Sequence, residues 1–183
     1  GLDYLESRGL DREDIERFCL GYAPDDRYWL KRFLKKKNYS EEFLRESGLF
    51  SKKYPEVSFF SRRIMFPIRS VQGDVIGFGG RLLSGEGPKY INSPESEYFT
   101  KGENLYGLYE SLKQIRRGRE FILVEGYTDV IAMYKAGFDT ALAPLGTAFT
   151  PRQAQKLKRY ADTGILVFDG DEAGKNAAKK AAN

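Results

Sequence analysis

The chain has 183 residues, of which 41% are hydrophobic and 14% aromatic, enough to bury a core in one or two domains. Its 30 Lys and Arg residues against 26 Asp and Glu give a formal net charge of +4, and it contains one cysteine and no histidine. This composition excludes an intrachain disulfide, a Cys/His zinc cluster and a histidine general base. The sequence also lacks a ~20-residue apolar run and a signal-peptide pattern, which predicts a cytoplasmic protein with no membrane partner.

The first 60 residues have a helical pattern. Asp11 is a candidate N-cap for a helix through Leu20, a basic amphipathic stretch covers residues 27–37, and Ser40 precedes a third helix start. Cys19 lies in the apolar-periodic part of the first of these helices, where a small core residue is expected rather than a reactive thiol.

The middle third carries the positive charge of the chain. Residues 61–119 contain 10 Lys and Arg against 6 Asp and Glu, whereas both flanking segments are balanced, so a phosphate-facing surface is indicated here. Apolar runs at 64–68 and 75–78, separated by a turn at 72–74, predict a β-hairpin. Pro67 predicts an edge or interrupted strand, because proline cannot donate to a strand ladder.

After residue 119 the pattern becomes regular, with short apolar strands that alternate with helices. The predicted strands are 121–124, 140–143 and 165–168, and the predicted helices are 129–135, 151–160 and an alanine- and lysine-rich segment ending at Asn183. Three successive strand-helix units predict a parallel sheet with helices on its faces. Ligands of such sheets bind beyond the carboxyl ends of the strands.

Carboxylates follow two of these strands. Glu125 and Asp129 come after the first strand, and Asp169 and Asp171 after the third, with glycines between them that favour sharp turns. Either motif alone is explained by a helix cap or a turn. Together, at strand ends of one sheet, they favour a divalent metal site, since clustered carboxylates repel one another unless a cation is shared.

The two acidic motifs, 125–129 (EGYTD) and 169–174 (DGDEAG), resemble the paired signature of the Toprim domain, which bacterial primases, topoisomerases and some nucleases share. The surrounding blocks are similar to the polymerase domain of bacterial DnaG-type DNA primases. These blocks are 4–10, 21–24, 62–68, 77–81, 88–95, 105–108 and 145–148. The resemblance implies a nucleotidyltransferase of DNA replication, a DNA-directed RNA polymerase that makes short RNA primers on single-stranded DNA.

The resemblance also implies roles for the acidic residues. Glu125 is expected as general base or metal ligand, Asp169 and Asp171 as metal ligands, and Asp129 as a supporting acid. The implied cofactor is Mg²⁺ or Mn²⁺, with no zinc in this part of the protein. Phosphoryl transfer depends on such metals to neutralise triphosphate charge and fix in-line geometry.

The basic middle third supplies the expected contacts to nucleic acid and nucleotide. These are Arg63, Arg81, Lys89 and Lys101, with Tyr90 and Asn92 for stacking and hydrogen bonding. The implied partners are a single-stranded DNA template, ribonucleoside triphosphates and the RNA primer. Four strand-spaced aromatics, Phe59, Phe60, Phe66 and Phe78, are expected in the core instead.

The predicted fold is mixed α/β, with an N-terminal α+β basic subdomain at 1–118 and a partial Toprim subdomain, a Rossmann-like parallel sheet with flanking helices, at 119–183. The family carries a zinc module before this region, and after it a further acidic pair and a region that contacts the replicative helicase. We therefore expect a fragment with an incomplete site and poor activity on its own. Two alternatives are a catalytically incomplete nucleic-acid or nucleotide-binding module, and part of a Toprim nuclease or topoisomerase.

Overall fold

Two β-sheets organise the chain in the computed structural model, which describes residues 1–182. The helices are α1 (Leu2–Ser7), α2 (Arg12–Arg17), α3 (Trp29–Lys35), α4 (Glu41–Glu46), α5 (Leu108–Gly118), α6 (Tyr127–Lys135), α7 (Pro151–Leu157) and α8 (Glu172–Ala182). The strands are β1 (Gly21–Ala23), β2 (Arg63–Arg69), β3 (Val75–Leu82), β4 (Tyr90–Asn92), β5 (Glu120–Leu123), β6 (Ala141–Leu142) and β7 (Thr163–Leu166). Asn183, where the last predicted helix ends, lies outside the described residues.

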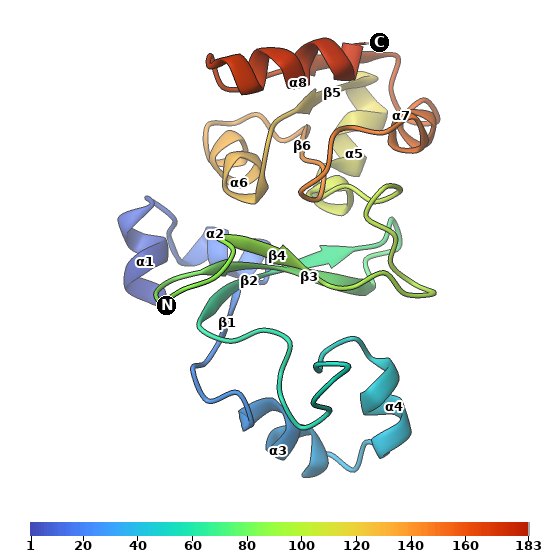
Figure 1. Cartoon of the computed structure of the whole chain (residues 1–183). Helices are drawn as coiled ribbons and strands as arrows, with labels where there is room; N and C mark the ends of the chain where they lie inside the picture. The colour runs from blue at the N-terminus through green and yellow to red at the C-terminus, as the bar shows by residue number, and fades with distance from the viewer. Residues whose placement is uncertain (183) are drawn as a thin grey trace.

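The elements form three tiers (Figure 1). The antiparallel sheet β1-β2-β3-β4, with α1 and α2 beside it, is the middle tier; β5 to β7 with α5 to α8 lie on one side of it, and α3 and α4 on the other. No helix within residues 1–182 combines the length and apolarity needed to cross a bilayer. The mixed α/β fold class predicted from the sequence is therefore confirmed.

The predicted helix starts in the N-terminal part are confirmed by their caps. Asp11 accepts a hydrogen bond from the Asp14 amide at 3.1 Å while Asp14 accepts one from the Asp11 amide at 3.0 Å, and Ser40 caps α4 through the Phe43 amide. The prediction for Cys19 is wrong: α2 ends at Arg17, and Cys19 takes a left-handed conformation (φ 49°) that leaves it exposed.

The predicted hairpin is confirmed as β2 and β3, which pair antiparallel. The prediction that Pro67 marks an edge or interrupted strand is confirmed in its second form: β2 lies between β1 and β3, but its pairing with β1 stops before Pro67. Pro67 fits there because β1 pairs only with Arg63–Met65 and has ended before it. On the other side Pro67 faces Phe78, whose amide and carbonyl both bond to Ser93 on the far side, so that pair needs no proline N–H.

The parallel sheet has the order β6-β5-β7, and both pairs are parallel, as predicted. Helix α5, which no sequence pattern above predicts, precedes β5 and buries Leu108, Leu112 and Ile115. Strand β7 is at the edge of this sheet within the described residues, and Ile165 is 42% exposed.

One buried cluster joins the two sheets. It combines Ile64, Phe66 and Ile68 of β2 with Tyr127 and Val130 of α6, together with other residues of both tiers. Of the four predicted core aromatics, Phe60 and Phe66 are buried and Phe78 is half-buried, whereas Phe59 is 36% exposed, so the core prediction is wrong for Phe59. Because the core is shared, the carboxyl ends of the parallel strands are held in a fixed relation to the antiparallel sheet.

Candidate functional site

The carboxyl ends of β5 and β7 bring two of the predicted acidic residues into contact. Glu125 follows the buried Val124, and Asp169 follows β7, the parallel neighbour of β5. The Asp169 amide donates a hydrogen bond to Glu125 Oε1 at 2.8 Å. We call the strand ends that carry Glu125 and Asp169 the carboxylate edge. The hydrogen bond fixes the orientation of the Glu125 side chain, which is otherwise exposed.

Asp129 stands beside this edge, in the first turn of α6. Its Oδ2 accepts a hydrogen bond from the Gly126 amide at 2.9 Å. Burial of the carboxylate raises the pKa of Asp129 above its ordinary value, the Gly126 hydrogen bond opposes this, and the charges of Asp169 and Glu125 raise the pKa further. The three carboxylates are therefore close enough to repel one another.

Asp171 has a different local role. Its Oδ1 accepts a hydrogen bond from the Gly174 amide at 2.7 Å, which caps α8. A Cβ on Gly174 would lie 2.1 Å from the backbone oxygen of Asp169, so the absence of a side chain lets α8 approach the carboxylate edge. None of Gly126, Gly170 and Gly174 has a positive φ, so none is required for a left-handed turn. At Gly174 the close approach of the Asp169 backbone explains the glycine.

The chemistry of these donors fits a hard divalent cation. All are carboxylate oxygens, and a cation would relieve the repulsion from Asp169 and Glu125 that adds to the effect of burial on the Asp129 pKa. In the described part of the chain, however, no three Asp, Glu or Cys side chains are grouped so that they could hold a metal alone. This arrangement suits Mg²⁺, which proteins commonly bind through one or two carboxylates together with water and substrate phosphates.

Tyr127 connects the carboxylate edge to the antiparallel sheet. Its hydroxyl donates to Asn92 Oδ1, and Asn92 Nδ2 donates to the Leu145 carbonyl at 2.7 Å. Its ring stacks on Phe66 and lies so close to β3 that a Cβ on Gly79 would be 2.4 Å from it. Asn92, predicted as a nucleic-acid contact, is thus used within the fold. The sequence showed Tyr127 inside the acidic motif but gave no sign of this role.

The predicted basic contacts divide into two kinds. Arg63 is 6% exposed, and its Nη1 donates to the carbonyls of Gly80 and Pro88 at 3.0 Å each, so the structure assigns it to holding the strands together. Burial lowers the pKa of Arg63 from its ordinary value. Lys89 is exposed, and Lys101 is half-buried in the loop between β4 and α5.

Arg81 lies between aromatic rings on the face of the antiparallel sheet. Its guanidinium carbon is 4.2 Å from the ring centroid of Tyr4 and 6.0 Å from that of Tyr90. This stacking leaves the edge of the guanidinium for other partners. Tyr90 in turn lies 6.0 Å from Tyr127, so Arg81 and the carboxylate edge are linked through a chain of packed rings.

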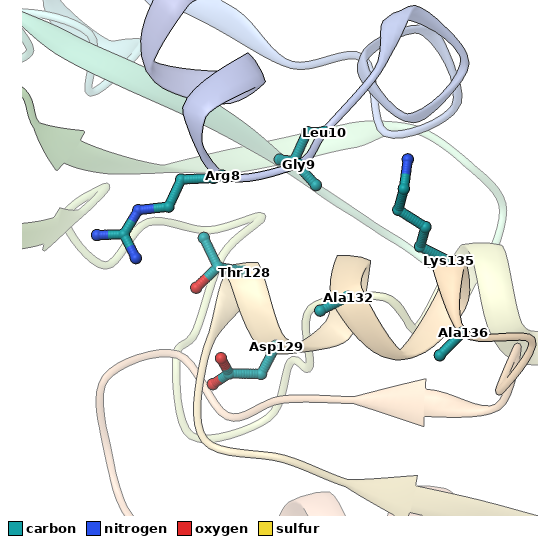
Figure 2. A pocket seen from close by; sticks show the side chains of 8 residues that line it. All are labelled: Arg8, Gly9, Leu10, Thr128, Asp129, Ala132, Lys135 and Ala136. Atoms are coloured by element: carbon teal, nitrogen blue, oxygen red, sulfur yellow. The ribbon is translucent and has the colours of Figure 1, made fainter.

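A pocket of about 560 Å³ lies next to Asp129 (Figure 2). Its walls come from the turn after α1 and from α6, and it is lined by Arg8, Gly9, Leu10, Thr128, Asp129, Ala132, Lys135 and Ala136. Figure 2 shows Lys135 extending toward the N-terminal segment, where it pairs with Asp14 at 2.9 Å. Arg8 and Asp129 extend to the other side of the view, with Thr128 between them.

Comparisons with known families cover all of the chain except residues 113–118. Residues 1–112 match the family described as DNA primase catalytic core, N-terminal domain. Residues 119–183 match the Toprim domain. The carboxylate edge lies in the second region, and Arg81, Lys89 and Tyr90 lie in the first.

Individual relatives agree with this result. The chain is 48% identical to a DNA primase of Borreliella burgdorferi over 98% of its length and 35% of that protein. It is also similar to the zinc-binding and RNA polymerase domains of Aquifex aeolicus primase, with TM-score 0.89, 42% identity, and coverage of 98% of this chain and 45% of that one. The RNA polymerase domain of Mycobacterium tuberculosis primase DnaG, in complex with a double-stranded DNA oligomer with a 6-nucleotide overhang, gives TM-score 0.88, 37% identity, and coverage of 97% and 59%. The chain spans about a third of the curated relatives it matches.

Proposed function

Because the chain belongs to the DNA primase catalytic-core family, we propose that it forms part of an enzyme that synthesises short RNA primers on single-stranded DNA. The observation that supports this most is the hydrogen bond between the Asp169 amide and Glu125 Oε1, at the carboxyl ends of two parallel strands. It holds a carboxylate in a fixed orientation at the edge where α/β sheets bind ligands.

Glu125 is the proposed general base. Because its Oε1 is held by the Asp169 amide, its other oxygen, Oε2, would accept the proton of the primer 3′-hydroxyl. The hydroxyl oxygen then bonds to the α-phosphate of a ribonucleoside triphosphate, the bond between the α- and β-phosphates breaks, and pyrophosphate leaves. Asp129 would act indirectly: its charge lies near Glu125, so its protonation state alters the basicity of that carboxylate.

The proposed metal is Mg²⁺ or Mn²⁺, which would neutralise charge on the triphosphate. Its protein ligands would come from Glu125, Asp169 and Asp171, one or two of which contact it at a time, and substrate phosphates and water would supply the remaining oxygens. Asp171 contributes through the carboxylate oxygen that does not cap α8, since Oδ1 is bonded to Gly174.

The proposed nucleic-acid face consists of Arg81, Lys89, Tyr90 and Lys101. Arg81 is stacked and prepositioned, and Lys89 is exposed on the adjoining loop, so both can reach phosphates with little reorganisation. Arg63 and Asn92 are left out of this face because their polar groups are engaged within the fold.

The test is primer synthesis by a chimera in which this chain replaces the matching segment of the Aquifex aeolicus primase, to which it is 42% identical. We expect ribonucleotide incorporation on a single-stranded template with Mg²⁺ or Mn²⁺. Glu125→Gln in the chimera should abolish incorporation and keep template binding within about two-fold. Glu120→Gln, at the start of the same strand, is the matched control and should remain active. Full synthesis by the Glu125→Gln chimera would refute the proposed role.

A further inference from the structure

Helix α7 carries a concentration of positive charge that the proposed function does not use. Between Leu145 and Ala161 the chain has four basic residues and no acidic one. Three of the four, Arg152, Lys156 and Arg159, line a single pocket of about 320 Å³ together with Glu103 and Gln155. None of these residues belongs to the carboxylate edge or to the proposed nucleic-acid face.

The positive charges in this pocket exceed the negative ones. Glu103 is the one acidic residue among those lining it, and it pairs with Arg152 at 2.5 Å. Arg159 forms no ion pair with any residue in the described range 1–182. Lys156 is half-buried, and its Nζ donates to Asn104 Oδ1 at 3.2 Å. Two cations therefore remain without a carboxylate partner, and an anion is the ligand that would complement them.

The desolvation of Lys156 supports the same conclusion. Burial lowers its pKa from the ordinary value, Glu103 acts in the opposite sense, and the charge of Arg159 lowers the pKa further. The cost of keeping two positive charges together is thus already present in the folded chain. A bound anion would remove it.

The pocket rests on a rigid support. Gln153, which is fully buried, donates to the carbonyls of Lys101 at 3.0 Å and Asn104 at 2.7 Å, and Thr150 Oγ1 donates to the Gly102 carbonyl at 2.6 Å. These bonds join α7 to the loop that carries Glu103 and Asn104. The cationic side chains of the α7 segment and the Glu103 carboxylate therefore project from two segments whose relative position is fixed.

The lining also indicates which anion fits. All five lining residues have polar side chains, and none is aromatic, so the pocket offers no ring on which a nucleobase could stack. Two guanidinium groups and an ammonium group suit the oxygens of phosphate, which accept paired hydrogen bonds from arginine. We propose that this pocket, formed by Arg152, Lys156 and Arg159, binds phosphate groups, either of a free polyphosphate or of a nucleic-acid backbone.

The test is calorimetric titration of the 183-residue chain with three probes: inorganic tripolyphosphate, ATP in EDTA, and oligodeoxythymidylate. Arg159→Gln should weaken tripolyphosphate binding by roughly five- to ten-fold, since a hydrogen bond to a charged group is lost from the site. Glu103→Gln should strengthen binding by roughly two- to five-fold, because it removes the opposing charge. An unfolded variant could not produce that gain.

Lys158→Gln is the matched control, because Lys158 has the same charge but lines a different pocket, between α7 and α8. It should change tripolyphosphate affinity less than two-fold or so, as expected for a screened neighbour. The source of the phosphate is identified by the probe whose affinity Arg159→Gln lowers more. A larger loss of affinity for ATP indicates a free polyphosphate, and a larger loss for oligodeoxythymidylate indicates a nucleic-acid backbone. Equal effects of Arg159→Gln and Lys158→Gln, or no gain from Glu103→Gln, would overturn the proposal. No nucleotidyl transfer is measured, so this outcome is independent of the test of primer synthesis.

Discussion

Replacement of Gly174 by alanine tests whether close packing of α8 sets the position of the carboxylate edge. The new Cβ would lie 2.1 Å from the backbone oxygen of Asp169, 2.9 Å from its carbonyl carbon and 3.0 Å from its nitrogen. These are backbone atoms, so either the Asp169 segment or the start of α8 must move. The movement would also strain the hydrogen bond from the Asp169 amide to Glu125 Oε1.

The expected cost of Gly174→Ala follows from these contacts. Overpacking costs ~1–3 kcal/mol, and a weakened hydrogen bond to an exposed carboxylate adds ~1 kcal/mol. The better helix propensity of alanine returns up to ~1 kcal/mol. The free energy of unfolding should therefore fall by about 1–3 kcal/mol, which lowers the melting temperature by roughly 3–10 °C for a chain of this size.

Gly170 is the matched control because it lies in the same motif. A Cβ there would meet no atom within 4 Å, and its φ is not positive. Gly170→Ala should be neutral or stabilise the chain by up to ~1 kcal/mol, through the reduced freedom of the unfolded chain. Thermal unfolding followed by circular dichroism compares the two variants. If Gly174→Ala melts at or above the temperature of Gly170→Ala, the close-packing argument is wrong.

Three further predictions concern the residues around the edge. The double change Arg81→Ala with Lys89→Ala should weaken binding of single-stranded DNA and reduce the slope of log affinity against log salt by roughly 1–2 units; an unchanged slope would show that neither side chain contacts phosphate. The folded-state pKa of Asp129 is raised, so the stability of the chain falls as the pH rises through that pKa. Asp129→Asn, measured in EDTA, should therefore raise the melting temperature at pH 7 and lose this advantage near pH 3. An equal gain at both pH values would contradict this. Tyr127→Phe removes the bond to Asn92 and should lower the unfolding free energy by about 1 kcal/mol in urea titrations, whereas a stability equal to wild type would show that the bond contributes nothing.

The sequence predicted the elements whose signals are local. The three strand-helix units were recognisable because each strand is a short apolar run and each helix begins with a capping residue or an alanine-rich pattern. Thr150, for example, accepts from the Gln153 amide at 3.1 Å at the start of α7. Strands β1 and β4 were missed, since three residues carry too little periodicity and both depend on pairing with a distant strand.

Side-chain direction could not be predicted from the sequence. Arg63 and Arg81 are both arginines of β-strands, yet one is buried against carbonyls and the other stacks on half-buried tyrosine rings. The difference arises because the loop at Pro88 and Lys89 folds over Arg63, a contact between segments about 25 residues apart. Likewise the apolar period placed Cys19 in a helix, but the helix ended two residues earlier and turned it outward.

The candidate site was predicted in outline and not in detail. Two acidic motifs at parallel strand ends imply proximity, and Glu125 does meet the Asp169 backbone. The capping of α8 by Asp171 and the close approach of Gly174 to the Asp169 backbone depend on how α8 packs. The sequence motif alone does not predict that packing. The proposed phosphate pocket on α7 was also missed, because basic and acidic residues balance over residues 120–183 as a whole and hide the basic run between Leu145 and Ala161. Glu103, from a segment about 50 residues earlier, joins this run only in the folded chain.

The central claim is that the carboxylate edge binds the divalent cation of the proposed reaction. Its most direct test is titration of the chain with Mn²⁺, followed by the loss of the electron paramagnetic resonance signal of the free ion. We expect saturable binding that the double change Glu125→Gln with Asp169→Asn abolishes and that Glu120→Gln leaves intact. Mn²⁺ binding of the same stoichiometry and affinity in the double variant would contradict the claim.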